Sequence, residues 1–379
     1  MTAATAFTWL AEQPMPTMPG NEPSRMRAEI AEQPAAVART LDTLLPRSGE
    51  VTALAAGTRQ VLFIARGTSD NAAVYGSYLV QVRNGRLATL ASPSVATTYR
   101  KRMDLSGVLA VALSQSGRTE EIVETLGWAG DCGARTIAVT NAAGSPLADT
   151  AEVAFTTEAG TERAVPATKT FTTQLAALAV ISIGLGAAPD GSAPDGAGED
   201  ELRRTPDELD RLLSAPMDLE ALVAELADVQ GVVVSGRGFA YSAALELALK
   251  LKEACYLHAM GLSYADLLHG PIAVVDGGTP AIVLAAEGGP ALDGSIALAR
   301  RVTGAGARAY GIGPGALARV CSRALPGPRL SEWLAPLGLI VPGQLLVESL
   351  ARRLGIDPDS PRGLTKVTQT DSSERPATT

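Results

Sequence analysis

The chain has 379 residues, a net charge of −8 and 46% hydrophobic residues, a composition that provides a large core and suggests two domains. Charged residues make up only 19% of the chain, and no basic run alternates with aromatic residues, which argues against a nucleic-acid partner. Three separated cysteines and two histidines offer no zinc-ligand spacing. We therefore expect a reduced, cytoplasmic protein that needs no metal or other cofactor.

The N-terminal end and the most apolar stretch both argue against a membrane protein. Residues 1–25 are rich in Thr, Pro and Met without periodicity, and we expect a flexible extension there. They carry no basic segment ahead of an apolar one, so they do not resemble a signal peptide. Residues 175–188 are too few and too rich in small side chains to span a bilayer, and they indicate a helix packed on a sheet.

From residue 61 onward, strand and helix patterns alternate, as they do in parallel βαβ units. The expected strands cover residues 61–65, 108–113, 136–140 and 153–156. The first two lead into helices that end near Val82 and Trp128. This pattern predicts a doubly wound parallel sheet between two layers of helices, which forms a domain over residues 26–186. In such sheets ligands bind at the carboxyl ends of the strands.

The polar turn after the second expected strand is a candidate binding site. Ser114, Gln115, Ser116 and Thr119 surround Gly117 at the start of a helix. A helix start has free backbone N–H groups that favour an anion, and neutral donors around a glycine suit a phosphate monoester. An ordinary Ser/Thr cap on a surface turn would contain the same residues, so both interpretations stay open on the residues alone.

A second α/β unit follows a segment rich in Gly, Pro, Ala and acidic residues. Residues 187–208 have that composition and are expected to form an exposed linker. The pattern of the first unit then recurs over residues 209–355, with strands at 231–235 and 281–286. The turn after the latter strand lacks hydroxyl side chains, so we expect the phosphate turn in the first domain only. Residues 356–379 would form a tail.

A charged helix and a His-Gly-Pro turn lie in the second domain. The helix expected over residues 241–258 carries Lys250 and Glu253 three positions apart, where an exposed ion pair is the ordinary interpretation. A catalytic role is the alternative, because the charges lie next to His269 in the sequence. The Gly-Pro after His269 must end a helix and expose the imidazole at a loop. His258 would lie inside the helix as a packed or capping residue.

Six motifs follow one another in an order that is known from one family. They lie at residues 26–34, 114–119, 160–175, 244–253, 269–271 and 361–366. In this order they resemble the isomerase part of glucosamine-6-phosphate synthase, which consists of two sugar isomerase (SIS) domains. The chain is therefore identified as a member of the SIS double-domain family, and the resemblance implies an α/β fold of two tandem SIS domains.

The resemblance implies a role for each candidate site residue. Glu253 would move a proton between C1 and C2 of the sugar, Lys366 in the tail would engage the open-chain carbonyl, and His269 would assist ring opening. In the family this histidine comes from the neighbouring subunit, so a homodimer with a shared active site is implied. The residues that would hold the sugar 6-phosphate are Ser69, Ser114, Gln115, Ser116 and Thr119. Glu162 and Lys169 lie in matching motifs and would support the site.

Departures from the synthase indicate the reaction. The synthase has a glutaminase domain ahead of this region, whereas only a short tail precedes residue 26 here, and residues 66–71 resemble the glutaminase-free amino-sugar-phosphate deaminases. We therefore expect a metal-independent deaminase-isomerase that converts glucosamine 6-phosphate to fructose 6-phosphate and ammonia. One alternative is a lyase that removes the C3 hydroxyl from N-acetylglucosamine 6-phosphate. Another is a non-catalytic sugar-phosphate sensor, against which the retention of Glu253, His269 and Lys366 together argues.

Overall fold

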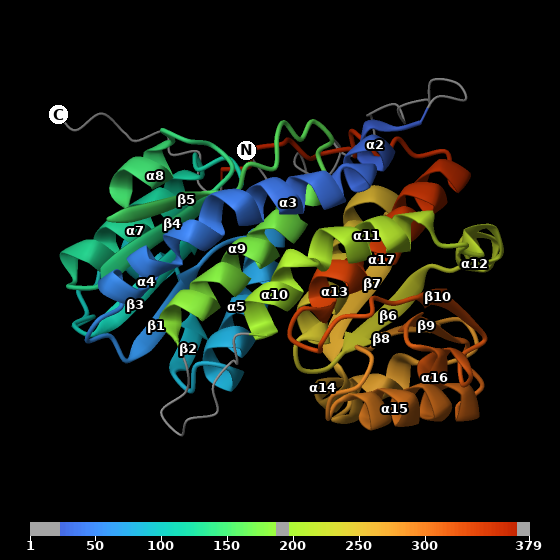
Figure 1. Cartoon of the computed structure of the whole chain (residues 1–379). Coiled ribbons are helices and arrows are strands. Elements are labelled where there is room, and N and C mark those ends of the chain that lie inside the picture. Colours follow the sequence, from blue (N-terminus) through green and yellow to red (C-terminus); the bar gives the residue numbers. More distant parts are fainter. Residues whose placement is uncertain (1–22, 187–196, 370–379) are drawn as a thin grey trace.

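The computed structural model describes residues 23–186 and 197–369 and contains two five-stranded parallel sheets (Figure 1). The first sheet has the order β2-β1-β3-β4-β5, and the second has the order β10-β9-β8-β6-β7. Taken from its other end, the second order repeats the first, which confirms two tandem α/β domains of one topology. The strands are β1 (Gln60–Ile64), β2 (Leu87–Leu90), β3 (Val108–Leu113), β4 (Arg135–Thr140), β5 (Val153–Thr156), β6 (Gly231–Gly236), β7 (His258–Ser263), β8 (Ala281–Leu284), β9 (Ala309–Gly313) and β10 (Arg323–Pro326).

The first sheet separates two layers of helices, because alternate side chains of its strands enter different cores. In β3, Leu109, Val111 and Leu113 join a large central core, whereas Ala110 and Ala112 join a smaller core on the other face. Burial on both faces explains why this strand is a continuous apolar run. The central layer contains α3 (Gln33–Leu44), α5 (Thr68–Val82) and α9 (Lys169–Leu185), and the outer layer contains α6 (Ser94–Thr97), α7 (Glu120–Asp131) and α8 (Pro146–Thr150).

The second sheet is layered in the same way and shares the central core. Val232 and Val234 of β6 join that core, and Val233 joins a separate outer core. One apolar core therefore continues across both domains and holds them together. The central layer on this side contains α11 (Thr205–Ser214), α12 (Leu219–Leu226), α13 (Ala240–Cys255) and α17 (Ala335–Arg353). The outer layer contains α14 (Tyr264–Leu268), η2 (Pro271–Val274), α15 (Leu292–Gly304) and α16 (Gly315–Ala318). The remaining described helices are α2 (Arg25–Ala31), η1 (Leu45–Arg47), α4 (Ser48–Leu54) and α10 (Ala197–Arg203).

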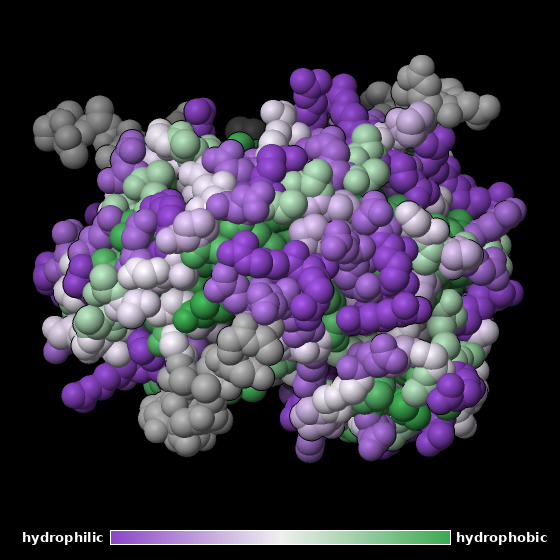
Figure 2. Space-filling view, in the orientation of Figure 1, coloured by the Kyte–Doolittle hydropathy of each residue, from purple (hydrophilic) through white to green (hydrophobic). Residues whose placement is uncertain are grey.

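The apolar stretch at residues 175–188 contributes to α9, which lies in the middle of the molecule beside α3 and α5 (Figure 1). Nearly all side chains of α9 are buried, which accounts for its composition. Within residues 23–186 and 197–369, no helix combines the length and the apolar character that a membrane crossing requires. The face in Figure 2 is mostly hydrophilic, including the surface over α10 and α11.

The prediction that His258 lies inside a helix is wrong. Helix α13 ends at Cys255, and Tyr256 takes the left-handed conformation with φ of 56°, which turns the chain out of the helix. The N–H of Tyr256 bonds to the carbonyl of Leu251 and closes the last turn. His258 is instead the exposed first residue of β7. The sequence of this strand, HAMGLS, is poor in β-branched residues and gave no strand signal.

Part of the predicted linker is folded. Helix α10 and the start of α11 occupy residues 197–208, and Leu202 is fully buried. Glu199 and Asp200 lie in the first turn of α10 and Arg203 in its last, an arrangement that the helix dipole favours. The predicted flexible extension over residues 1–25 ends too late, because Ser24 is the buried N-cap residue of α2 and Arg25 begins this helix. The remainder of the extension, of the linker and of the tail lies outside the described part of the chain, at residues 1–22, 187–196 and 370–379.

Candidate active site

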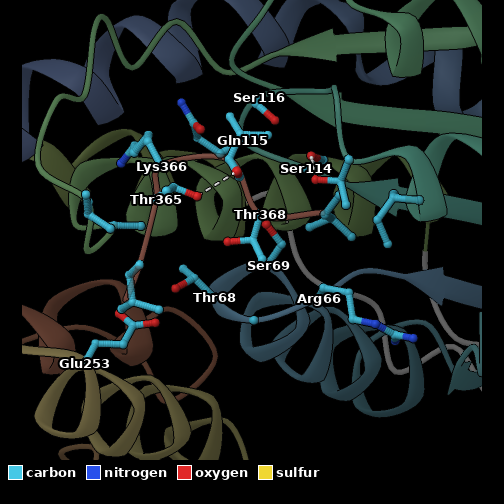
Figure 3. Close-up of a pocket in the computed structure, with 18 of the residues that line it drawn as sticks. Arg66, Thr68, Ser69, Ser114, Gln115, Ser116, Glu253, Thr365, Lys366 and Thr368 are labelled. Atoms are coloured by element: carbon cyan, nitrogen blue, oxygen red, sulfur yellow. Dashed lines mark hydrogen bonds between the residues drawn. The ribbon is translucent and has the colours of Figure 1, made fainter. Parts of the chain in front are cut away.

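A cavity of about 410 Å³ opens at the carboxyl ends of β1 and β3. These neighbouring strands flank the point where the strand order of the first sheet reverses, which is where open α/β sheets bind ligands. Both domains and the tail contribute to its walls (Figure 3). The lining residues are Arg66, Gly67, Thr68, Ser69, Leu113, Ser114, Gln115, Ser116, Thr119, Ile122, Val165, Ala167, Lys250, Glu253, Leu364, Thr365, Lys366, Val367 and Thr368.

The turn after β3 brings hydroxyl groups to this cavity. Ser114 Oγ and Thr119 Oγ1 lie 3.5 Å apart across the turn, and Ser116 Oγ accepts a hydrogen bond from the N–H of Arg118 at 3.2 Å. Thr119 is the N-cap residue of α7, yet its side chain makes no capping hydrogen bond. The interpretation of this turn as an ordinary Ser/Thr cap is therefore not supported, and the hydroxyls line the cavity instead.

Ser69 reaches the same cavity from the first turn of α5. Gly67, with φ of 58°, turns the chain from β1 into this helix, and Ser69 Oγ accepts a hydrogen bond from Gln174 Nε2 at 3.0 Å. The structure thus brings together all five residues that the family resemblance assigns to the phosphate, since Ser114, Gln115, Ser116 and Thr119 also line the cavity. Neutral donors at two helix starts suit a small dianion.

The phosphate turn has no room for a side chain at Gly117. Its φ is 62°, and a Cβ there would lie 2.1 Å from Ser145 Oγ. We expect Gly117→Ala to lower the free energy of unfolding by about 1–3 kcal/mol and to weaken sugar-phosphate binding, because the turn must move. Gly144→Ala is the matched control, because its φ is 64° but its Cβ would have no atom within 4 Å, so it should cost about 1 kcal/mol. Equal losses in urea unfolding of the two variants would contradict the close approach at Gly117.

Glu253 lies in the last turn of α13 and lines the cavity with 22% of its side chain exposed. Its Oε2 lies 2.5 Å from Nζ of Lys250, whose side chain is 1% exposed. The same Nζ lies 3.4 Å from Oε1 of Glu246, which is fully buried. The expected ion pair is formed, but the interpretation of it as an exposed pair is wrong, because Lys250 is buried where α13 packs against α5.

Glu246 is the most deeply buried member of this charged group. It accepts hydrogen bonds from Thr68 Oγ1 at 3.0 Å and Asn71 Nδ2 at 2.8 Å, so the first domain supplies donors to a carboxylate of the second. Burial raises the pKa of Glu246 to about 7, although Lys250 acts in the opposite direction. Burial also opposes the charged form of Lys250, but Glu246 and Glu253 outweigh it and raise the pKa of this ammonium. Lys250 therefore stays charged beside Glu253.

The tail brings Lys366 into the lining of the cavity. Its Nζ lies 2.6 Å from Oε2 of Glu162 and donates to the carbonyl of Ala164 at 2.7 Å. The buried Glu162 carboxylate also accepts the N–H of Thr168 at 2.8 Å, next to the start of α9. Burial alone would raise the pKa of Glu162, but Lys366 and the hydrogen-bond donors outweigh it and lower that pKa. A charged pair is thus held at the cavity wall.

The two groups of side chains are separated in the close-up view. Glu253 and Lys366 lie toward the left of Figure 3, and Ser69 and Ser114 lie to their right. Arg66 points away from the cavity, where its guanidinium pairs with Glu121 at 3.0 Å. The cavity therefore offers neutral anion-binding groups at one end and ionised groups at the other.

Among the described residues predicted to be catalytic or to bind the phosphate, His269 alone lies outside the cavity lining. It is the exposed C-cap residue of α14, which confirms the loop position expected of its imidazole. It is absent from the cavity lining formed by the described residues. Lys169 is also outside the lining, since it is buried and pairs with Glu32. In the described ranges no group of three or more His, Cys, Asp or Glu side chains is placed to hold a metal ion.

In the second domain, the side chain of Glu332 occupies the place that corresponds to the phosphate site of the first domain. Gly238 follows β6 and Gly289 follows β8, the strands that correspond to β1 and β3. A Cβ on Gly289 would lie 2.4 Å from Oε2 of Glu332, and one on Gly238 would lie 3.3 Å from Oε1. Burial raises the pKa of this carboxyl group. A carboxylate packed between the two turns disfavours an anion there, which supports a phosphate turn in the first domain alone.

Known proteins are similar to this chain in sequence and in fold. The model of the SIS domain matches residues 56–183 and 225–324, one match in each domain. The glutamine–fructose-6-phosphate aminotransferase (isomerizing) of Thermococcus kodakarensis is 34% identical over 352 residues, which cover 91% of this chain and 58% of that protein. The C-terminal domain of the glucosamine-fructose-6-phosphate aminotransferase of Francisella tularensis superposes with a TM-score of 0.81 at 27% identity, covering 91% of this chain and all of that one. The glucosamine-6-phosphate deaminase of Thermotoga maritima shares the fold, with a TM-score of 0.69 at 22% identity over 91% of this chain and all of that one.

Two tandem sheets of one topology, with a polar cavity at the strand-order reversal of the first, define a double-domain α/β protein of the sugar-phosphate isomerase class. The chain belongs to the SIS family, as its ordered motifs imply. It spans less than three fifths of the length of the aminotransferase of Thermococcus kodakarensis.

Proposed function

We propose that this chain is a metal-independent deaminase-isomerase that converts glucosamine 6-phosphate to fructose 6-phosphate and ammonia. The observation that carries the proposal is the single cavity that contains the phosphate turn, Glu253 and Lys366. Neutral donors suit the phosphate, and a carboxylate beside an ammonium suits proton transfer next to a carbonyl. The aminotransferases similar to this chain act, by their name, on fructose 6-phosphate, which supports a phosphorylated amino sugar as the substrate.

In the proposed reaction the sugar ring opens and exposes the C1 aldehyde. Glu253 takes the proton from C2, and the ammonium groups of Lys250 and Lys366 stabilise the negative charge that develops on O1. Glu253 then returns the proton to C1 while the lone pair of the amine nitrogen forms the C2=N bond. A proton passes from this nitrogen to O1, which leaves an imine at C2 and a hydroxyl group at C1. Water adds to this imine and ammonia leaves, so that fructose 6-phosphate is formed.

Separate incubations with glucosamine 6-phosphate and N-acetylglucosamine 6-phosphate test this proposal. Ammonia and fructose 6-phosphate in equal amounts from the free amine would establish the deaminase. An ultraviolet-absorbing product from the acetylated sugar alone would establish a lyase, because the amide nitrogen stays on C2 while the C3 hydroxyl leaves. Binding of fructose 6-phosphate without turnover of either sugar would favour a sensor.

We further propose a homodimer in which His269 acts in the cavity of the neighbouring copy. Its exposed position outside the lining of its own cavity supports this arrangement. Glu253→Gln and His269→Asn should each have little activity alone. An equimolar mixture after subunit exchange should recover about a quarter of the wild-type rate, because half of the dimers are mixed and each has one intact site. Mixed dimers without activity would contradict a shared site.

A further inference from the structure

The end of the described tail is bonded to the phosphate turn. Gln369 Oε1 accepts a hydrogen bond from the N–H of Glu120 at 3.0 Å, and Gln369 Nε2 donates to the carbonyl of Arg118 at 3.1 Å. The amide thus contacts one donor and one acceptor on either side of Thr119. The N–H of Glu120 belongs to the first turn of α7, where such groups lack a helical partner, and the side chain of Thr119 makes no capping bond. Gln369 therefore supplies the missing contact from 249 positions away.

The tail is fixed at its other end to the first described helix. The carboxylate of Asp359 accepts the N–H groups of Arg25 and Met26 at 2.8 Å each. Between this anchor and Gln369 the tail crosses the cavity, because the side chains of residues 364–368 form part of its wall. The tail is thus a strap that is held on both sides of the cavity.

Lys366 lies within this strap, close to the Gln369 anchor. Three residue steps join the two positions, so about 10 Å of extended chain at most separates their Cα atoms. Lys366 Nζ pairs with Glu162 at 2.6 Å in the closed strap. Loss of the Gln369 contacts would leave the tail beyond Lys366 without its anchor on the phosphate turn, so that the contacts with Glu162 and Ala164 alone would hold the ammonium from this side.

We propose that Gln369 is a positioning residue, which couples the arrangement of the phosphate turn to the placement of Lys366. This inference rests on the proposed phosphate site. A phosphate bound by Ser114, Ser116 and Thr119 orders the backbone of residues 114–120, which includes both partners of the Gln369 amide. Two hydrogen bonds of opposite direction need both partners correctly oriented, so an ordered turn holds the strap closed more strongly than a free turn does. Phosphate binding at one end of the cavity thereby brings the ammonium to the other.

Hydrogen exchange measured with and without saturating fructose 6-phosphate tests this coupling. In the wild-type protein we expect the ligand to slow exchange in peptides that cover residues 114–120 and 361–369. In Gln369→Ala the turn peptide should keep its ligand-induced protection except at the N–H of Glu120, which loses its acceptor. Protection of the tail peptide should fall by about tenfold or more, because the tail loses both hydrogen bonds that hold it to the turn. Arg118→Ala is the matched control, because it removes an exposed side chain and keeps the carbonyl that Gln369 binds.

The rates of Gln369→Ala give a second test that a merely structural role would not satisfy. Since Lys366 acts on the carbonyl and not on the phosphate, we expect kcat to fall by about tenfold with less than about a threefold change in KM. Equal tail protection in Gln369→Ala and in the wild-type protein would overturn the coupling and leave the proposed function intact. A turn peptide that does not respond to fructose 6-phosphate in the wild-type protein would overturn both.

Discussion

Glu253→Gln is expected to lower kcat with glucosamine 6-phosphate by about 10²- to 10⁴-fold, because an amide of the same shape cannot accept the proton from C2. Substrate binding should change little, since the phosphate turn lies at the other end of the cavity. The fold should persist, because the variant removes one of the two carboxylates beside Lys250 and leaves Glu246 at 3.4 Å. Steady-state kinetics, together with calorimetric binding of fructose 6-phosphate, separates the two effects.

Two further variants on α13 sharpen this test. Glu253→Asp keeps the carboxylate but shortens its reach, so it should retain more turnover than Glu253→Gln. Lys252→Met changes an exposed charge on the same helix turn and should leave turnover unchanged. In heavy water the wild-type protein should place deuterium at C1 of the product, and Glu253→Gln should not. Normal turnover and exchange in Glu253→Gln would place the base elsewhere.

The alternation of strands and helices and the phosphate turn can be predicted because both depend on neighbouring residues. The strands β1, β3 and β4 are short apolar runs buried on both faces, and the hydroxyls of residues 114–119 follow β3 directly. The strands β2, β7, β9 and β10 were not predicted from the sequence. β9 contains two glycines and β10 ends in proline, residue types that weaken a strand pattern.

The contacts that hold Glu253 and Lys366 at the cavity cannot be predicted from neighbouring residues in the sequence. Lys250 and Glu253 stand three apart on a helix, a spacing that fits an exposed pair as well as a buried one. Lys250 and Glu246 are both buried on α13, which packs against α5 of the first domain. Thr68 of that helix donates to Glu246 and lies 178 positions away in the sequence. The pair of Glu162 and Lys366 spans 204 positions. The family resemblance indicated Glu253 and Lys366, but only the three-dimensional structure shows what holds them.

Lys250→Met is expected to destabilise the protein by about 3–5 kcal/mol near pH 8, because it removes the cation beside a fully buried carboxylate. The loss should be much smaller near pH 5. Burial already raises the pKa of Glu246 to about 7 while Lys250 is present, and that pKa must rise further when the cation is removed. A carboxyl group whose pKa is raised in the folded state favours folding while it is protonated, and this contribution is lost as the pH increases from about 4.5 through the folded-state pKa. Urea unfolding at the two pH values measures the difference.

The double variant Glu246→Gln/Lys250→Met isolates the buried charge as the cause. It removes the carboxylate together with its cation, and its amide oxygen can still accept from Thr68 or Asn71. Most of the stability lost near pH 8 should therefore return, while turnover should stay low because the ammonium beside Glu253 is missing. If Lys250→Met lost the same stability at both pH values, and the double variant recovered none of it, lost packing of the lysine stem would explain the effect better than an unpaired charge. Recovery of stability without recovery of activity would instead separate the structural role of the buried charged group from its role in the reaction.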